Sequence, residues 1–202
     1  MANLKQIEQA FLDCGNAEYD VFSRNAKKLE IRGAQIIWKN FEGRMNDFGS
    51  AKRQFTIVIP EQVAVMLQQR GWNVKSKLLE RFDVNGQPAE PAVVTADGQI
   101  PTAYYVTINV SMDGDFPPII TRISQINNQT VEEVMNLATV KDLDRDTFLD
   151  ASVIINEYVS ERGKTRKVSG YLNKMTVVTD PESREVDFGG RYEHYFGNNT
   201  NE

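Results

Sequence analysis

The chain has 202 residues, of which 41% are hydrophobic and 25% are charged. This composition predicts one folded core, and it argues against both a disordered chain and two full domains. The formal net charge of −5 argues against nucleic-acid binding only if charge is evenly spread, because affinity for phosphate depends on clustered Lys and Arg.

Charge is not evenly spread along this sequence. Residues 24–53 contain eight cations and three anions, a net of +5, and a second basic cluster, "ERGKTRK", lies at 161–167. Residues 180–202 contain six acids and two arginines. The sequence therefore predicts a basic body and an acidic tail.

The N-terminal half predicts a hairpin followed by a helix. Residues 2–12 have apolar side chains at helical spacing, typical of a short amphipathic helix or a frayed arm. Residues 29–40 and 53–60 have strand-like patterns and predict a β-hairpin with a long loop between them. Residues 61–70 predict a helix that ends at Gly71.

The next segments predict further strands and an irregular excursion. Residues 72–82 alternate as a strand does, with Trp72 on the core side. Residues 83–102 are rich in Pro, Gly and Ala and predict a loop with a short hairpin at 92–102. Residues 103–112 and 119–124 predict two more strands.

The C-terminal part predicts a helix and a second hairpin. Residues 130–140 have apolar residues at helical spacing, and Thr130 with Glu133 makes a capping box. Residues 151–160 and 168–179 predict two strands joined by the basic cluster.

Six or so strands with two inserted helices lack the regular alternation of a parallel α/β sheet. The predicted fold class is mainly β with inserted helices, an OB-fold-like antiparallel Greek-key barrel with elaborated loops. The expected organisation is an N-terminal arm or short helix over 1–30, an OB-like domain over 31–180 and an acidic, flexible tail over 181–202.

Catalytic constellations are largely missing from the sequence. His194 is the single histidine and Cys14 the single cysteine, so catalytic triads and multi-His or multi-Cys metal sites are unavailable. Asp142, Asp144 and Asp146 have the spacing of a calcium loop without its glycine and distal glutamate, which predicts a solvated loop. We expect no enzyme activity, no metal and no cofactor.

Aromatic and cationic residues interleave in the first hairpin, and this combination favours single-stranded nucleic acid, since bases stack on rings while phosphates meet cations. Phe41 and Phe48 lie in the polar loop and are the expected stacking residues, whereas Trp38 could equally belong to the core. One of Tyr104 and Tyr105 must face outward. The candidate binding residues are Trp38, Lys39, Phe41, Arg44, Phe48, Lys52, Arg53, Lys75, Lys77, Tyr105, Arg162, Lys164, Arg166 and Lys167.

Several motifs resemble one known family. The order "IWKNFEG" at 37–43, "RQFTI" at 53–57 and "GWNVK" at 71–75, then "YYVTINV", "PPII" and "VSGYLNKMTVV", is similar to bacteriophage single-stranded DNA-binding proteins encoded in the replication regions of tailed phages. Ile57 stands where the family pattern has Val. The resemblance covers roughly residues 30–180. It implies an OB-like protein that coats single-stranded DNA in phage replication or recombination.

Other functions stay open at this stage. A protein–protein module, such as a phage scaffold component or a host-defence inhibitor, fits the net charge and the acidic tail, and a Mg²⁺-dependent nuclease is a further rival. On the leading hypothesis the partners are single-stranded DNA and, through the tail, phage replication or recombination proteins. No segment is apolar enough for a membrane span, so we expect a cytoplasmic location in the host cell.

Overall fold

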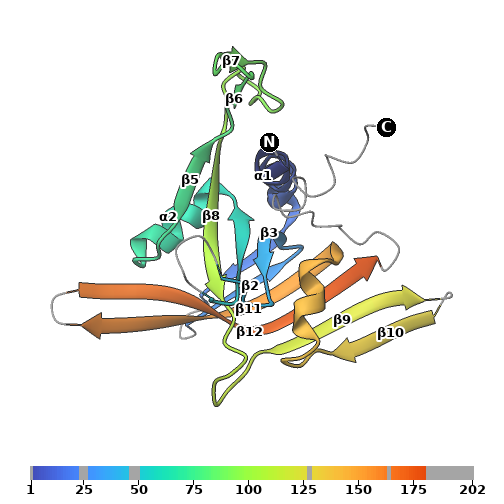
Figure 1. The fold of residues 1–202 in the computed structure, drawn as a ribbon. Helices are drawn as coiled ribbons and strands as arrows, with labels where there is room; N and C mark the ends of the chain where they lie inside the picture. Colours follow the sequence, from blue (N-terminus) through green and yellow to red (C-terminus); the bar gives the residue numbers. More distant parts are fainter. Residues whose placement is uncertain (1, 23–26, 46–50, 127–128, 163–164, 181–202) are drawn as a thin grey trace.

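The computed structural model describes residues 2–22, 27–45, 51–126, 129–162 and 165–180. It is mainly β with inserted helices, which confirms the predicted class (Figure 1). The helices are α1 (Ala2–Asp13), α2 (Glu61–Gln69) and the short 3₁₀ turns η1 (Cys14–Asn16) and η2 (Val140–Asp144). The strands are β1 (Glu18–Val21), β2 (Lys28–Arg32), β3 (Gln35–Asn40), β4 (Gln54–Ile59), β5 (Lys75–Leu78), β6 (Arg81–Phe82), β7 (Pro88–Ala89), β8 (Thr102–Asn109), β9 (Ile119–Ile126), β10 (Gln129–Val134), β11 (Thr147–Arg162) and β12 (Thr165–Asp180).

The main sheet follows the order β1-β2-β11-β12-β8-β4-β3. β3 is one end of this order and β2 is next to the other end. These two strands follow each other in the chain and are separated by a bend at Gly33, whose φ of 73° few other residues adopt. The N–H of Ala34 donates to the carbonyl of Ala151 on β11 at 2.8 Å. Before the bend, β2 pairs with β11, and after it, β3 pairs with β4. This pairing gives the strand order of a partly open OB-like barrel.

The sheet is mainly antiparallel, as predicted, but it also contains parallel pairs. β12 pairs in parallel with β8 and, farther along, with β9. The long excursion between β8 and β12 supplies the crossover that a parallel pair needs. Figure 1 shows the consequence: the β11–β12 hairpin extends to one side of the barrel, and the β9–β10 hairpin extends to the other.

The core fills the inside of the barrel and one of its ends. Phe55, Ile57 and Ile59 of β4 point inward and are at most 1% exposed. Leu67 of α2 and Trp72 join the same cluster. The prediction that Trp72 is a core residue is confirmed, at 6% exposed.

The predicted N-terminal helix is present, and it packs on the outside of the barrel. Ile7 and Ala10 of α1 form a second apolar cluster with Ile37 of β3 and Val58 of β4. This helix therefore covers part of the outer surface of β3, β4 and β8.

The helix predicted over 130–140 is wrong. Residues 129–134 form β10, which pairs antiparallel with β9, and Glu133 lies opposite Arg122 and forms an ion pair with it. The pairing with β9 outweighs the local capping signal, as tertiary context often does. The strands predicted over 29–40 and 72–82 are each divided in two. The short hairpin predicted at 92–102 is wrong in position: it is made by β6 and β7, at 81–89.

Candidate nucleic-acid interface

The β3–β4 loop is held at its start by a carboxylate far away in the sequence. Asp144 Oδ1 accepts the N–H of Phe41 at 2.6 Å, and its Oδ2 accepts that of Glu42 at 2.9 Å. Asp144 is 6% exposed and Asp146 is 2% exposed. The expectation of a solvated loop is wrong for these two acids, because each accepts hydrogen bonds that compensate its burial.

The stacking role predicted for Phe41 is wrong. Asp144 turns the loop backbone inward, and the Phe41 ring is fully buried against Phe55, with 5.5 Å between ring centroids. A ring with no exposed surface cannot receive a base. Phe48, the other expected stacking residue, lies outside the described residues.

The cations of this loop differ in how strongly they are engaged. Arg44 lies 3.3 Å from Glu42 and 3.6 Å from Asp144, and Arg53 Nη1 donates to Asp113 at 2.9 Å. Lys52 is exposed. Since the two arginines already have acidic partners, they are weaker candidates for phosphate contact than Lys52.

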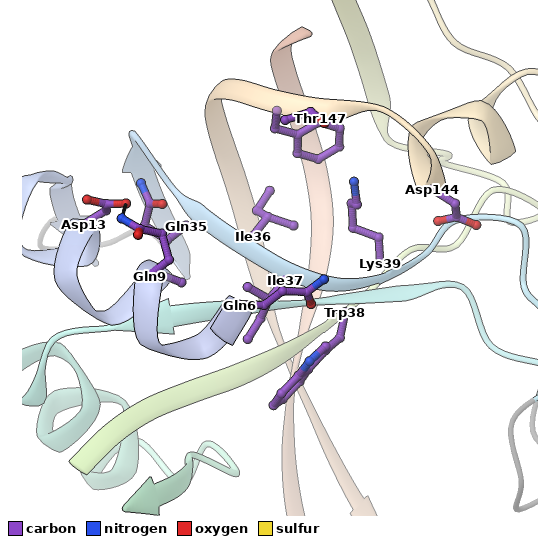
Figure 2. Close-up of a pocket in the computed structure, with 12 residues that line it drawn as sticks. Gln6, Gln9, Asp13, Gln35, Ile36, Ile37, Trp38, Lys39, Asp144 and Thr147 are labelled. Carbon is purple, nitrogen blue, oxygen red and sulfur yellow. Dashed lines mark hydrogen bonds between the residues drawn. The ribbon is translucent and has the colours of Figure 1, made fainter. Parts of the chain in front are cut away.

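Trp38 and Lys39 line one pocket but point in different directions (Figure 2). Trp38 has a φ of 49°, a strained value for a bulky residue, at the register shift between β3 and β4. Its ring meets Tyr105 edge-on, 5.2 Å between centroids. Lys39 donates to the carbonyl of Asp146 and lies 4.4 Å from the Phe148 ring centroid. Both predicted residues are therefore partly engaged inside the fold.

This pocket lies between α1 and β3 and has a volume of ≈ 490 Å³. Gln6 and Gln9 of α1 line one side, and Gln35 lines the strand side. Within the described part of the chain, the buried Nε1 of Trp38 has no hydrogen-bond partner.

The lysines of β5 share a sheet face with Tyr105. Lys75 lies opposite Tyr105, and Lys77 lies opposite Ala103. Directly opposite residues of paired strands project to the same side. Both lysines are exposed, so their cationic ends are available on this face.

The basic turn predicted after β11 is the tip of the β11–β12 hairpin. Arg166 and Lys167 are exposed neighbours on β12 and project to opposite faces. Arg166 lies opposite Glu161, and Lys167 lies opposite Ser160. The side chain of Arg162 and the whole of Lys164 lie outside the described residues. The structure thus does not gather all four cations on one side.

The sequence analysis missed two exposed tyrosines. Tyr158 of β11 and Tyr171 of β12 are 58% and 38% exposed, and their rings meet edge-on at 5.8 Å between centroids. They border an open groove of ≈ 610 Å³ with Lys27 and Lys28. The exposure of Tyr158 could be predicted from strand alternation, because Tyr158 shares a face of the strand with the polar Asn156 and not with the buried Ile155.

Strand register places the tyrosines and several lysines on one face. Asn156 lies opposite both Lys28 and Tyr171, and Tyr171 also pairs with Asn109 of β8. Asn109 in turn shares its face with Tyr105. We call this surface the tyrosine face; it comprises Lys28, Lys75, Lys77, Tyr105, Thr107, Asn109, Asn156, Tyr158, Lys167, Ser169 and Tyr171.

An ion pair with one buried member, Glu157, lies beneath the tyrosines. Glu157 accepts hydrogen bonds from Arg70 at 2.8 and 2.9 Å and from Trp72 Nε1 at 2.9 Å. Burial alone would raise the pKa of Glu157, but the hydrogen bonds from Arg70 and Trp72 lower this pKa below its ordinary value. Glu157 is therefore ionised, and its charge is compensated by Arg70.

The single cysteine, Cys14, is buried. Burial raises the pKa of the Cys14 thiol to about 11, which keeps it protonated at neutral pH. Among the described residues, no group of three His, Cys, Asp or Glu side chains could hold a metal ion. None of the described helices has the length and apolar run needed to span a bilayer.

Comparison with known proteins decides the family. The family model described as "Putative phage ssDNA-binding domain" matches residues 20–178. The chain belongs to this family. This confirms the resemblance inferred from the motifs around Trp38, Phe55 and Trp72, and it extends the matched region ten residues farther toward the N-terminus than the motifs did.

Solved structures of phage ssDNA-binding proteins also resemble this family member. The single-stranded DNA-binding protein from bacteriophage Enc34 is 7% identical, with a TM-score of 0.42 over 89% of this chain and 98% of that one. The same Enc34 protein in complex with ssDNA is 8% identical, with a TM-score of 0.40 over 82% and 96%. No curated protein matches the sequence. At these values the structural likeness adds no residue-level argument.

Proposed function

We propose that this protein is a non-catalytic, sequence-tolerant single-stranded DNA-binding protein that coats DNA during phage replication or recombination in the host cytoplasm. Membership of the phage ssDNA-binding domain family supports this proposal. The observation that carries it is the tyrosine face, on which Lys28, Lys75, Lys77 and Lys167 project from three strands of a sheet.

The charge of this face suits a phosphate backbone despite the negative sign of the whole chain. Lysines on neighbouring strands attract phosphates locally, because charges beyond about 10 Å are largely screened at 0.1 M salt. Lys75 and Tyr171 pair with β8 residues four positions apart, roughly 13 Å at the rise of a strand. This distance allows one DNA strand to contact both.

The OB-like topology also favours binding on this side of the barrel. OB-folds bind oligonucleotides on the face of their second and third strands and on two flanking loops. Here these strands are β4 and β8, and the loops are the β3–β4 loop and the tip of the β11–β12 hairpin. Since α1 covers part of the β4–β8 surface, the proposed contact surface is displaced toward β8, β11 and β12.

Other cations predicted from the sequence also belong to the proposed interface, but they differ in how available they are to phosphates. Lys52 and the hairpin-tip cations are proposed phosphate contacts, and Arg44 and Arg53 would first have to exchange an acidic partner. The acidic segment 181–202, outside the described residues, is proposed to dock on phage replication or recombination proteins.

A salt titration tests this function. Fluorescence polarisation would compare labelled oligo-dT, a duplex and an RNA of equal length over a range of salt concentrations. We expect preference for the single strand and a steep fall in affinity, with a slope of about −0.7 in log K against log[salt] per phosphate contact. Absence of binding to oligo-dT at low salt would overturn the proposal and favour the protein–protein module.

A further inference from the structure

We propose that Tyr158 and Tyr171 form the base-stacking platform of this protein, in a groove whose cationic edge holds the phosphates. The proposal rests on the proposed function and assigns a nucleobase site to two residues that are not among the binding residues predicted from the sequence. The ligand class is an unpaired nucleotide within a single strand.

The geometry leaves aromatic surface available to a ligand. Tyr158 and Tyr171 are 58% and 38% exposed, and their rings stand nearly perpendicular, at 81°. An edge-on pair leaves ring faces uncovered, and a base that enters the groove of ≈ 610 Å³ would meet one of them. Of the rings predicted from the sequence, two that the structure describes are less available: Phe41 is buried, and Trp38 packs on Tyr105.

The groove provides charge and hydrogen bonding beside the rings. Lys27 and Lys28 line it, together with the amide of Asn156. Of the described residues that line it, one is acidic: Glu157, whose carboxylate is already bound by Arg70 and Trp72. A DNA strand that stacks on the tyrosines would therefore meet two lysines that have no acidic partner among the described residues.

Charge also indicates the direction in which the strand runs. The same sheet face becomes acidic toward β1, where Asp20 lies opposite Glu30. In the other direction it leads to Lys167 on the hairpin and to Lys75 on β5. The phosphates of the bound DNA would follow these lysines. The DNA strand therefore extends from the tyrosines toward the β11–β12 hairpin and β5, away from β1.

A purely structural role for the two rings predicts different behaviour. Cross-strand aromatic contacts stabilise exposed hairpins modestly, and replacement by Thr, which suits strands well, would then change stability without changing base preference. If the rings stack on bases, their replacement should weaken binding only to DNA that carries bases.

The experiment compares oligo-dT with an abasic oligonucleotide of equal length. Polarisation binding would be measured for the wild type, Tyr158→Thr, Tyr171→Thr, the double variant and the two Tyr→Phe variants. Phe82→Thr on β6 is the matched control, because Phe82 is 52% exposed and lies in the distant β6–β7 arm (Figure 1). Thermal melting would show that each variant is folded.

We expect each Tyr→Thr change to weaken oligo-dT binding roughly 5- to 150-fold, the range that corresponds to about 1–3 kcal/mol per stacked base. Abasic binding should change little. The Phe variants, which keep the ring, should recover most of the oligo-dT affinity, and the Phe82→Thr control should bind as the wild type does. If the wild type binds oligo-dT and the double variant retains its preference for bases, the platform is wrong while the function stands. If the wild type binds no single strand, both fail.

Discussion

Trp72 packs directly on Gly170, the residue before Tyr171 on β12. A Cβ added at Gly170 would lie 2.5 Å from Cζ3 and 2.6 Å from Cη2 of the Trp72 ring. Trp72 is also fixed by its hydrogen bond to Glu157, so the ring cannot move away without losing a buried partner. The close approach of β12 to this ring depends on the missing side chain.

Replacement of Gly170 by Ala should therefore destabilise the fold by about 1–3 kcal/mol, the usual cost of overpacking a core. Urea unfolding would measure the change. Gly15→Ala is the control, since a Cβ at Gly15 meets nothing within 4 Å, and this variant should stay within about 0.5 kcal/mol of the wild type. Equal stability of the two variants would mean that Trp72 can move.

Glu157→Gln should also destabilise the protein, because it leaves Arg70 without its carboxylate partner. A fully buried pair would cost about 3–5 kcal/mol to break, but the Arg70 side chain is 38% exposed, so we expect about 1–3 kcal/mol in urea unfolding. Glu18→Gln removes the exposed ion pair with Arg32 and should have almost no effect. A similar loss in both variants would contradict a special role for Glu157.

Stability should fall in acid, and Glu157 should account for part of the fall. Its pKa is lowered in the folded state, so its contribution is complete above the unfolded value of about 4.3. The contribution is lost as pH falls through the lower folded pKa. The pKa of Glu8 is lowered by hydrogen bonds from Arg81 and acts in the same direction. Unfolding free energies between about pH 7 and pH 3 should therefore decline less in Glu157→Gln than in the wild type; parallel curves would disprove the assignment.

Asp144→Ala should loosen the β3–β4 loop without unfolding the barrel. The variant leaves the N–H groups of Phe41 and Glu42 without their acceptor. Hydrogen exchange at these two amides should accelerate at least severalfold, while the buried amide of Ile57 in β4 keeps its protection. Asp144→Asn retains one acceptor oxygen and should give an intermediate result. Unchanged exchange in both variants would show that the loop needs no such anchor.

Lys167→Gln should weaken single-strand binding and make it less dependent on salt. Loss of one phosphate contact lowers the slope of log K against log[salt] by about 0.7. Lys141→Gln, an exposed lysine of η2 outside the tyrosine face, should leave the slope unchanged. If both variants have the wild-type slope, the hairpin makes no phosphate contact through Lys167.

The sequence predicted those elements whose pattern is local. The β3–β4 hairpin, α2 and the β11–β12 hairpin follow from alternation and end signals within each segment. The local pattern of β10 predicts a helix, but the residues form a strand because they pair with β9. The bend at Gly33 is not predictable from a single glycine, because the sequence does not show that β2 and β3 pair with different strands.

The candidate site was less predictable for a related reason. Phe41 lies in a polar loop, yet its orientation depends on Asp144, which is 103 residues away in the sequence. No local pattern reports such a contact. The exposure of Tyr158 and Tyr171 could be predicted from the alternation along each strand. Their proximity could not, because it depends on the register of two long strands.

β12 contacts β11 along its whole length and divides its other edge between β8 and β9. A truncation that removed the end of this strand, from Asn173 onward, would remove the strand that joins β9 to the rest of the sheet and would also shorten the ladder with β11. We therefore expect the β9–β10 hairpin and the barrel to unfold as one cooperative unit, and a fragment that ends before Thr179 to lose part of this pairing.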